Sequence, residues 1–303
     1  MFPSAFFTAF QNLSPTTRAA LWMSVSAFGY AASAAIVRHL TATLPVFEVA
    51  FLRNVFGLMF MLPWLMRVGL GALRTRHLGR HAVRGVVSLL NMWCLFAALS
   101  LAPVAEVSAI TFLMPITASV LAVILLKERA SSQQWAVALL GFLGAMIVIR
   151  PGMAGFNAGL LFALGAVIAG SAVAIMIKTL LRTDSSDTVA TYLFISHTVF
   201  GLIPALLVWR WPGPWELFWL VILGSLAAVT QRGFNRAMAL ADATVVLPVN
   251  FTRLIWATLF GYLAFAEIPD LWTWVGGVVI FASSIYLARL NRSKGKDIGA
   301  NLG

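Results

Sequence analysis

Ten apolar runs, each close to 20 residues long, follow one another along the chain with only short connections between them. A helix of about 20 residues crosses the ~30 Å hydrocarbon core of a bilayer. Because lipid offers the backbone no hydrogen-bond partners, runs of this length are expected to be helical. The expected spans are residues 16–39, 45–66, 79–101, 103–126, 132–149, 156–178, 187–209, 214–239, 243–266 and 270–289. The sequence therefore predicts an all-α polytopic membrane protein with ten transmembrane helices.

The composition supports a lipid bilayer as the surroundings. Of the 303 residues, 61% are hydrophobic and only 10% are charged, whereas a soluble domain carries about 25% charged residues. The net charge of +11 would suit nucleic acid, but the basic residues lie in short segments between apolar runs. This distribution is typical of membrane-topology signals, so no nucleic-acid partner is expected.

Lysine and arginine are distributed unequally between the two sets of connections. If both termini share one side, that side holds sixteen basic residues: Arg18, Arg67, Arg74, Arg76, Arg80, Arg84, Lys127, Arg129, Lys178, Arg182, Arg232, Arg236, Arg289, Arg292, Lys294 and Lys296. The other side holds three, Arg38, Arg150 and Arg210. By the positive-inside rule, we expect a multi-pass protein of the cell inner (plasma) membrane with both termini cytoplasmic.

One stretch of the sequence occurs twice. Shifted by 139 positions without a gap, Ala98–Trp135 lies on Ala237–Trp274. Identical residues include Glu128 with Glu267 and Trp135 with Trp274, which lie outside the apolar core. We therefore expect two five-helix repeats, residues 1–150 and 151–303, in one integrated membrane domain. Because five is odd, the second repeat crosses the membrane in the opposite sense, and such inverted repeats are typical of transporters rather than enzymes.

Polar and aromatic side chains inside the spans are the candidates for a transport path, because polar groups in lipid are costly. The candidate substrate-binding residues are Tyr30, Asn91, Trp93, Thr111, Phe112, Gln231, Asn235, Asn250, Arg253 and Trp256, and the candidate hinges are Pro115 and Pro248. The alternative for each polar residue is a hydrogen bond that only holds neighbouring helices together.

Two arginines fall within spans. Arg53 is expected to bond nearby backbone or to pair with Glu48. Arg253 lies deep in the ninth span, and no acidic residue of the sequence is evidently at the same depth. Either it meets a substrate carboxylate beside Asn250, or it braces a helix through backbone carbonyls or a distant acid.

The sequence has no ATP-binding loop of the G-x-x-x-x-G-K-[ST] type and no acidic pair in the middle of a span, which favours secondary transport and a substrate-driven uniporter. The single cysteine, Cys94, and four scattered histidines indicate no disulfide, metal or cofactor. His77 and His81 have a spacing that can bind metal, but their arginine-rich surroundings favour a solvated basic turn.

Ten spans arranged as five plus five resemble the drug/metabolite transporter (DMT) superfamily and its EamA-type exporters. The residues that carry the resemblance are Pro45–Arg53 (PVFEVAFLR), Pro115 within TFLMP, and Glu128 and Glu267, each followed by Trp seven residues later. Within the superfamily the chain is most similar to the aromatic amino-acid exporter (YddG-type) branch. The resemblance implies a central cavity lined by helices 1, 3, 4, 6, 8 and 9 and alternating access.

These patterns together predict an exporter of small zwitterionic metabolites, most simply aromatic or other large apolar amino acids. Arg253, Asn250, Asn91 and Gln231 would hold the charged groups, while Trp93, Trp256, Phe112 and Phe251 would form an aromatic wall. A multidrug or cationic-drug exporter and, more remotely, a polytopic membrane enzyme are the alternatives. The protein is expected to be a monomer or a homodimer.

Overall fold

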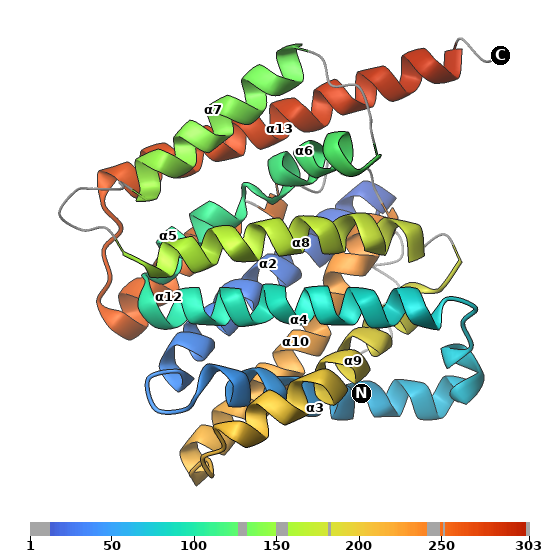
Figure 1. Ribbon diagram of the computed structural model, residues 1–303, viewed down its shortest axis with the longest axis vertical. Helices are drawn as coiled ribbons and strands as arrows, with labels where there is room; N and C mark the ends of the chain where they lie inside the picture. Colours follow the sequence, from blue (N-terminus) through green and yellow to red (C-terminus); the bar gives the residue numbers. More distant parts are fainter. Residues whose placement is uncertain are drawn as a thin grey trace.

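The computed structural model describes residues 13–126, 132–149, 157–180, 183–240, 249–250 and 252–300, and all regular structure in these residues is helical (Figure 1). The elements are α2 (Pro15–Leu40), α3 (Val46–Val68), the 3-10 turn η1 (Leu70–Leu73), α4 (Leu78–Leu101), α5 (Val104–Thr111), α6 (Met114–Leu126), α7 (Ser132–Ile149), α8 (Gly159–Leu180), α9 (Ser186–Leu207), α10 (Pro214–Leu240), α12 (Thr252–Phe265) and α13 (Leu271–Ala300). A helix occupies each expected span, so the all-α prediction is confirmed. Pro248 and Phe251 of the ninth span, together with residues 243–247, lie outside the described residues.

Short polar side chains set several helix starts. Ser14 precedes Pro15, the first residue of α2, and its hydroxyl accepts a hydrogen bond from the Thr17 backbone N–H at 3.1 Å. Ser185 caps α9 in the same way, accepting from the Thr188 N–H at 3.1 Å. Both caps satisfy backbone donors that a helix leaves unpaired at its start.

The fourth span is broken in its middle. Helix α5 ends at Thr111, and the Phe112 and Leu113 amides bond to carbonyls three residues earlier in a tight turn before α6 begins. Proline at position 115 has no N–H to continue the α-helical ladder, so the carbonyl four residues earlier is released from it. The break therefore exposes backbone acceptors in the middle of the bundle, next to a predicted hinge residue.

Helix pairing follows the exchange of the two repeats. The first helices of the two repeats are α2 and α8, and the third helices are α4 and α10. The pair α2 with α10 and the pair α4 with α8 are both closely packed, and each pair becomes the other when the two repeats are exchanged. Helices α7 and α13, which lie side by side in Figure 1, are counterparts of each other, as are α3 and α9. This symmetry supports two structurally equivalent five-helix halves.

The outer surface of the bundle is apolar. Six helices of at least 18 residues are long and apolar enough to cross a membrane, and shorter apolar helices accompany them in the described part of the chain. Large apolar side chains point outward, for example Met66 with 83% of its surface exposed and Leu207 with 81%. Such a surface is stable in lipid and would aggregate in water.

Gly224 lets the backbone of α10 come close to the backbone of α3. A Cβ atom there would lie 2.4 Å from Phe56 Cβ and 3.0 Å from the Arg53 carbonyl oxygen. We expect Gly224→Ala to lower the unfolding free energy by about 1–3 kcal/mol through overpacking. Gly79→Ala, with no atom within 4 Å of the added carbon, is the matched control. Equal melting temperatures of the two variants in detergent would contradict the close crossing.

Candidate substrate site

Arg253 of α12 extends into the break between α5 and α6. Its guanidinium group donates to Thr111 Oγ1 and, at the longer distance of 3.5 Å, to the Ser108 carbonyl oxygen. Aromatic rings lie on two sides of it, with centroids 4.9 Å away for Phe112 and 5.9 Å for Tyr30. The structure therefore brings together Tyr30, Thr111, Phe112 and Arg253, which the sequence nominated from three different spans.

A second guanidinium group, that of Arg53, belongs to the same region. Arg53 Nη1 donates to Asn54 Oδ1 at 3.3 Å and contacts Met92 Sδ at 3.4 Å. The ring centroid of Phe96 lies 5.9 Å from its central carbon. Both guanidinium groups lie within electrostatic range of the Tyr30 side chain, whose ring centroid is 5.9 Å from the central carbon of Arg253.

The expected pairing of Arg53 with Glu48 is wrong. Glu48 is buried at the start of α3, where its Oε2 accepts a hydrogen bond from the Arg210 backbone N–H at 2.9 Å. Five residues along a helix correspond to 500° of rotation, so the two side chains point in different directions. Arg53 therefore reaches toward α4, and sequence reasoning left this arginine out of the candidate site.

Neither of these arginines joins an ion pair among the described residues. Their partners are hydroxyl, amide, carbonyl and sulfur atoms and the faces of aromatic rings. Two positive charges in a partly buried region attract anions strongly, because the local dielectric is lower than that of water. We define the substrate site as Tyr30, Arg53, Thr111, Phe112 and Arg253.

The other nominated residues make contacts with residues outside this site. Asn91 Nδ2 donates to the Ala166 carbonyl oxygen at 2.5 Å and so links α4 to α8. Gln231 donates to Asn235 within α10 at 3.3 Å. Trp256 packs edge-on against Phe28 at 5.2 Å, and Trp93 packs edge-on against Phe47 at 5.0 Å. The Asn250 Oδ1 atom is buried and has no hydrogen-bond partner among the described residues.

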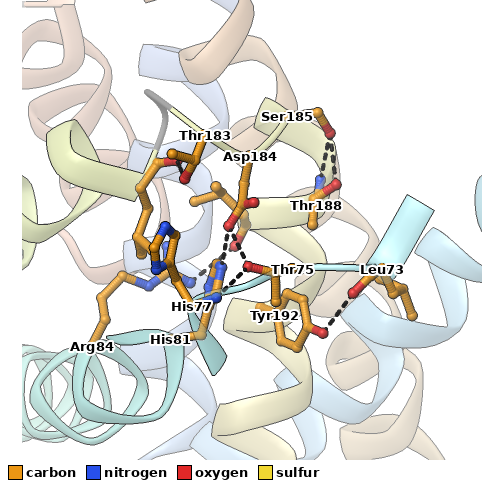
Figure 2. A network of polar contacts seen from close by, with 12 residues as sticks. Leu73, Thr75, His77, His81, Arg84, Thr183, Asp184, Ser185, Thr188 and Tyr192 are labelled. Carbon is orange, nitrogen blue, oxygen red and sulfur yellow. Dashed lines mark hydrogen bonds and ion pairs between the residues drawn. The ribbon is translucent and has the colours of Figure 1, made fainter. Parts of the chain in front are cut away.

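A polar network ties the connection between α3 and α4 to the connection between α8 and α9 (Figure 2). Asp184 Oδ2 accepts a hydrogen bond from Thr75 Oγ1 and contacts His81 Nε2, each at 2.8 Å. Tyr192 stacks on His81 with a centroid distance of 4.4 Å, and its hydroxyl donates to the Leu73 carbonyl oxygen. We call Thr75, His81, Asp184 and Tyr192 the His81 network.

The expectation of a solvated basic turn is wrong for His81 and for Arg84. Each is only 1% exposed, and the Arg84 guanidinium donates to the Val189 carbonyl oxygen at 2.9 Å. The sequence places them among exposed arginines, but Asp184, more than 100 residues away, supplies the partner that allows His81 to be buried.

A comparable network lies at the opposite ends of α3 and α9. Thr43 Oγ1 bonds to Glu216 Oε1, and Arg210 donates to the Thr43 carbonyl oxygen at 2.9 Å and, through its backbone N–H, to Glu48. We call Thr43, Glu48, Arg210 and Glu216 the Glu216 network. The Glu216 network joins the α2–α3 and α9–α10 connections, which are the counterparts in the other repeat of the α8–α9 and α3–α4 connections joined by the His81 network. Because both networks are formed in the same structure, they hold α3 and α9 together at both ends. We call these two helices and the two networks the frame.

The carboxylate of Asp184 is the central acceptor of the His81 network. Burial opposes its ionisation, but the hydrogen bonds from His81 and Thr75 outweigh burial and hold the pKa of Asp184 below its usual range. A lowered folded-state pKa stabilises the protein above the unfolded-state value, which is about 3.9 for Asp, and this stabilisation is lost as the pH falls through the folded-state pKa.

We expect Asp184→Asn to lower the unfolding free energy at pH 7 by about 1–3 kcal/mol, because His81 then loses a charged acceptor. The variant is also expected to lose less stability than the wild type when the pH is lowered from 6 to about 3. Thermal denaturation in detergent at several pH values measures both effects. Parallel curves for the two proteins would contradict this role of Asp184.

Two repeats of five helices around a polar, positively charged centre define a membrane transporter with a buried binding site. The sequence profile described as "EamA-like transporter family" matches the chain twice, at residues 17–150 and 157–289. The chain belongs to this family, and the twofold match agrees with the repeat expected from the sequence.

Named relatives cover almost the whole chain. A riboflavin transporter of Vibrio cholerae serotype O1 is 28% identical over 91% of this chain and 95% of its own length. An S-adenosylmethionine uptake transporter of Rickettsia bellii is 29% identical over 88% of this chain and 91% of its own length. One solved crystal structure matches with a TM-score of 0.63 at 21% identity, covering 89% of this chain and 97% of that chain, which supports the fold.

The comparison supports a membrane transporter of small metabolites, as the sequence predicted. The named relatives carry riboflavin or S-adenosylmethionine, and neither is named as an aromatic amino-acid exporter of the YddG type. The resemblance to the DMT superfamily and its EamA-type transporters is therefore confirmed, whereas the comparisons do not support the YddG-type branch.

Proposed function

We propose that the chain is a secondary transporter for flat aromatic or heteroaromatic metabolites whose polar edge is anionic or rich in hydrogen-bond acceptors. The observation that carries the proposal is a pair of arginines, Arg53 and Arg253, that form no ion pair with any described residue. Arg253 lies beside the rings of Tyr30 and Phe112, and Arg53 lies beside the ring of Phe96. A guanidinium group presents several parallel donors to acceptor oxygens, and the rings offer faces on which a flat ligand stacks.

The charge of the site discriminates between the ligand types of the relatives. Riboflavin is uncharged and presents ring carbonyl oxygens, so it suits two arginines. S-adenosylmethionine carries a sulfonium ion and an ammonium group beside one carboxylate, and its net positive charge is repelled by the same arginines. The riboflavin type of ligand is therefore the favoured one.

Aromatic amino acids form the second candidate class. Their carboxylate can pair with Arg253 while the ring stacks on Phe112, and both side chains are already in contact at the break between α5 and α6. The ammonium group would then need acceptors, which the Thr111 hydroxyl and the carbonyls at the end of α5 offer. Cationic drugs fit least well, because no carboxylate in the described residues accompanies the arginines.

We further propose that both termini are cytoplasmic and that the domains are the two repeats, residues 1–150 and 151–303. The support is the excess of basic residues on one side, together with the inverted repeat. The Glu216 network then lies at the external end of the bundle and the His81 network at the cytoplasmic end. In a Cys94→Ala background, impermeant thiol reagents added to intact cells are expected to label a cysteine at position 152 and not one at 78. The reverse pattern would contradict the orientation.

Flux into proteoliposomes tests the substrate class. Labelled riboflavin, tryptophan, phenylalanine and S-adenosylmethionine are measured with and without a pH gradient, and empty liposomes are the control. We expect the fastest exchange for riboflavin, slower exchange for the amino acids, and little for S-adenosylmethionine. Preferred transport of S-adenosylmethionine would contradict the assignment of an anion-attracting site.

A further inference from the structure

An ion pair between the two repeats lies at the same end of the bundle as the Glu216 network. Arg38, in the last turn of α2, pairs with Glu267 Oε1 at 2.5 Å. The same guanidinium group donates to the carbonyl oxygens of Leu99 and Ala102 at the end of α4, and it lies 5.3 Å from the Phe265 ring centroid. One side chain thus links α2, α4 and α12.

Glu267 adds a further helix to this contact. Its other carboxylate oxygen, Oε2, accepts a hydrogen bond from the Val104 N–H, the first residue of α5, at 3.2 Å. The preceding residue, Ala266, has φ of +55°, a left-handed conformation that costs a residue with a Cβ about 1 kcal/mol or more. The chain accepts this strain and places the carboxylate between the repeats, where it is only 17% exposed.

The ion pair joins the ends of α2 and α12, two of the helices that supply the substrate site. Arg38 follows Tyr30 by eight residues on α2, which is about 12 Å along the helix axis. Glu267 follows Arg253 beyond the end of α12. A ligand that enters between α2 and α12 therefore passes the level at which the ion pair joins them.

The space beside the ion pair is too small for a metabolite. A cavity of about 140 Å³ is lined by residues from the α4–α5 region and from the end of α12, including Glu106, Thr258, Gly261 and Glu267. Sites for small organic ligands have volumes of about 300 Å³ or more. The cavity beside the ion pair is therefore too small to admit a metabolite while the pair is formed.

Building on the transport function proposed above, we propose that Arg38 and Glu267 form the gate that closes this end of the transport path. In the orientation proposed above, this end is external. When the pair separates, α2 and α12 part and the site opens to that side. The frame of α3 and α9 stays intact, because its networks are formed at both ends at once.

Accessibility of a cysteine tests the gate without any knowledge of the substrate. In a Cys94→Ala/Thr258→Cys background, an impermeant thiol reagent is added to each face of the membrane in turn. Glu267→Gln and Arg38→Gln are each expected to raise the rate at which the position-258 cysteine is labelled from the external face at least about tenfold, because the closed state loses its ion pair. Glu216→Gln, which changes a carboxylate of the frame at the same end, is expected to leave the rate unchanged. Equal rates in all variants would overturn the gate.

Cross-linking tests the link between gate and transport. In the Cys94→Ala background, Arg38→Cys/Glu267→Cys is joined by a short bifunctional thiol reagent whose linker is released by reduction. Transport is expected to stop on cross-linking and to recover on reduction, while the matched frame pair Thr43→Cys/Glu216→Cys remains active when cross-linked. Undiminished transport by the cross-linked gate variant, or equal arrest of both variants, would overturn the proposal. Absence of transport for every ligand in the wild type would instead count against the substrate class, and the labelling result would still decide the gate.

Discussion

Arg253→Gln is expected to reduce substrate flux by at least about 30-fold, because truncating one partner of a buried charge-assisted pair costs about 2–5 kcal/mol. Glutamine is uncharged and shorter than arginine, so the substitution removes both the charge and the Nη2 contacts with Thr111 and the Ser108 carbonyl oxygen. Because the new side chain is smaller, it does not overpack the space between α5 and α12.

The same variant separates the two roles open to Arg253. If Arg253 binds substrate, its glutamine variant retains the wild-type melting temperature and loses flux and the stabilisation that a ligand confers. If Arg253 only braces the broken helix, the melting temperature falls while flux per folded molecule persists, and the substrate role is refuted. Arg253→Lys is the companion variant, because it keeps the charge and loses the planar set of donors. An intermediate flux in this variant is expected.

The residues around Arg253 could be predicted from the sequence, because each is a polar or aromatic residue within an apolar run. Thr111 and Phe112 stand out as polar and aromatic residues just before a proline in an apolar run, and Tyr30 and Arg253 stand out as polar groups inside spans. The span boundaries were equally accessible, since hydrophobic length and helix caps are local properties. What the sequence could not give is the break itself, which divides the expected span 103–126 into α5 and α6.

The contacts that the sequence missed join residues far apart in the chain. His81 with Asp184 and Arg38 with Glu267 are separated by more than 100 residues, and each depends on how the two repeats pack. Arg53 was expected to bond nearby backbone or to pair with Glu48, both close in sequence, whereas its contacts are with Asn54 and Met92. A periodic pattern identifies which face of a helix is buried, but it contains no information on the partner helix.

Arg53→Gln is expected to change the charge preference of the site more than its preference for ring shape. With an effective dielectric of about 20, a charge about 8 Å from a guanidinium group gains or loses about 2 kcal/mol. Removing this guanidinium group therefore weakens binding of a monoanion about 10- to 100-fold and strengthens binding of a monocation by a similar factor, because the other arginine alone then sets the potential.

Three indole ligands isolate this effect, since indole-3-propionate, tryptophan and tryptamine share a ring and differ by one unit of charge at each step. Their affinities for the purified protein, measured by ligand-induced thermal stabilisation, give the charge preference directly. Arg80→Gln is the matched control, because Arg80 is exposed near the start of α4 and water and salt screen its charge. The Arg53 variant is expected to shift the preference toward tryptamine, and the Arg80 variant to leave it unchanged. A uniform loss of affinity for all three ligands would instead make Arg53 a structural residue, with Arg253 as the principal anion-binding group.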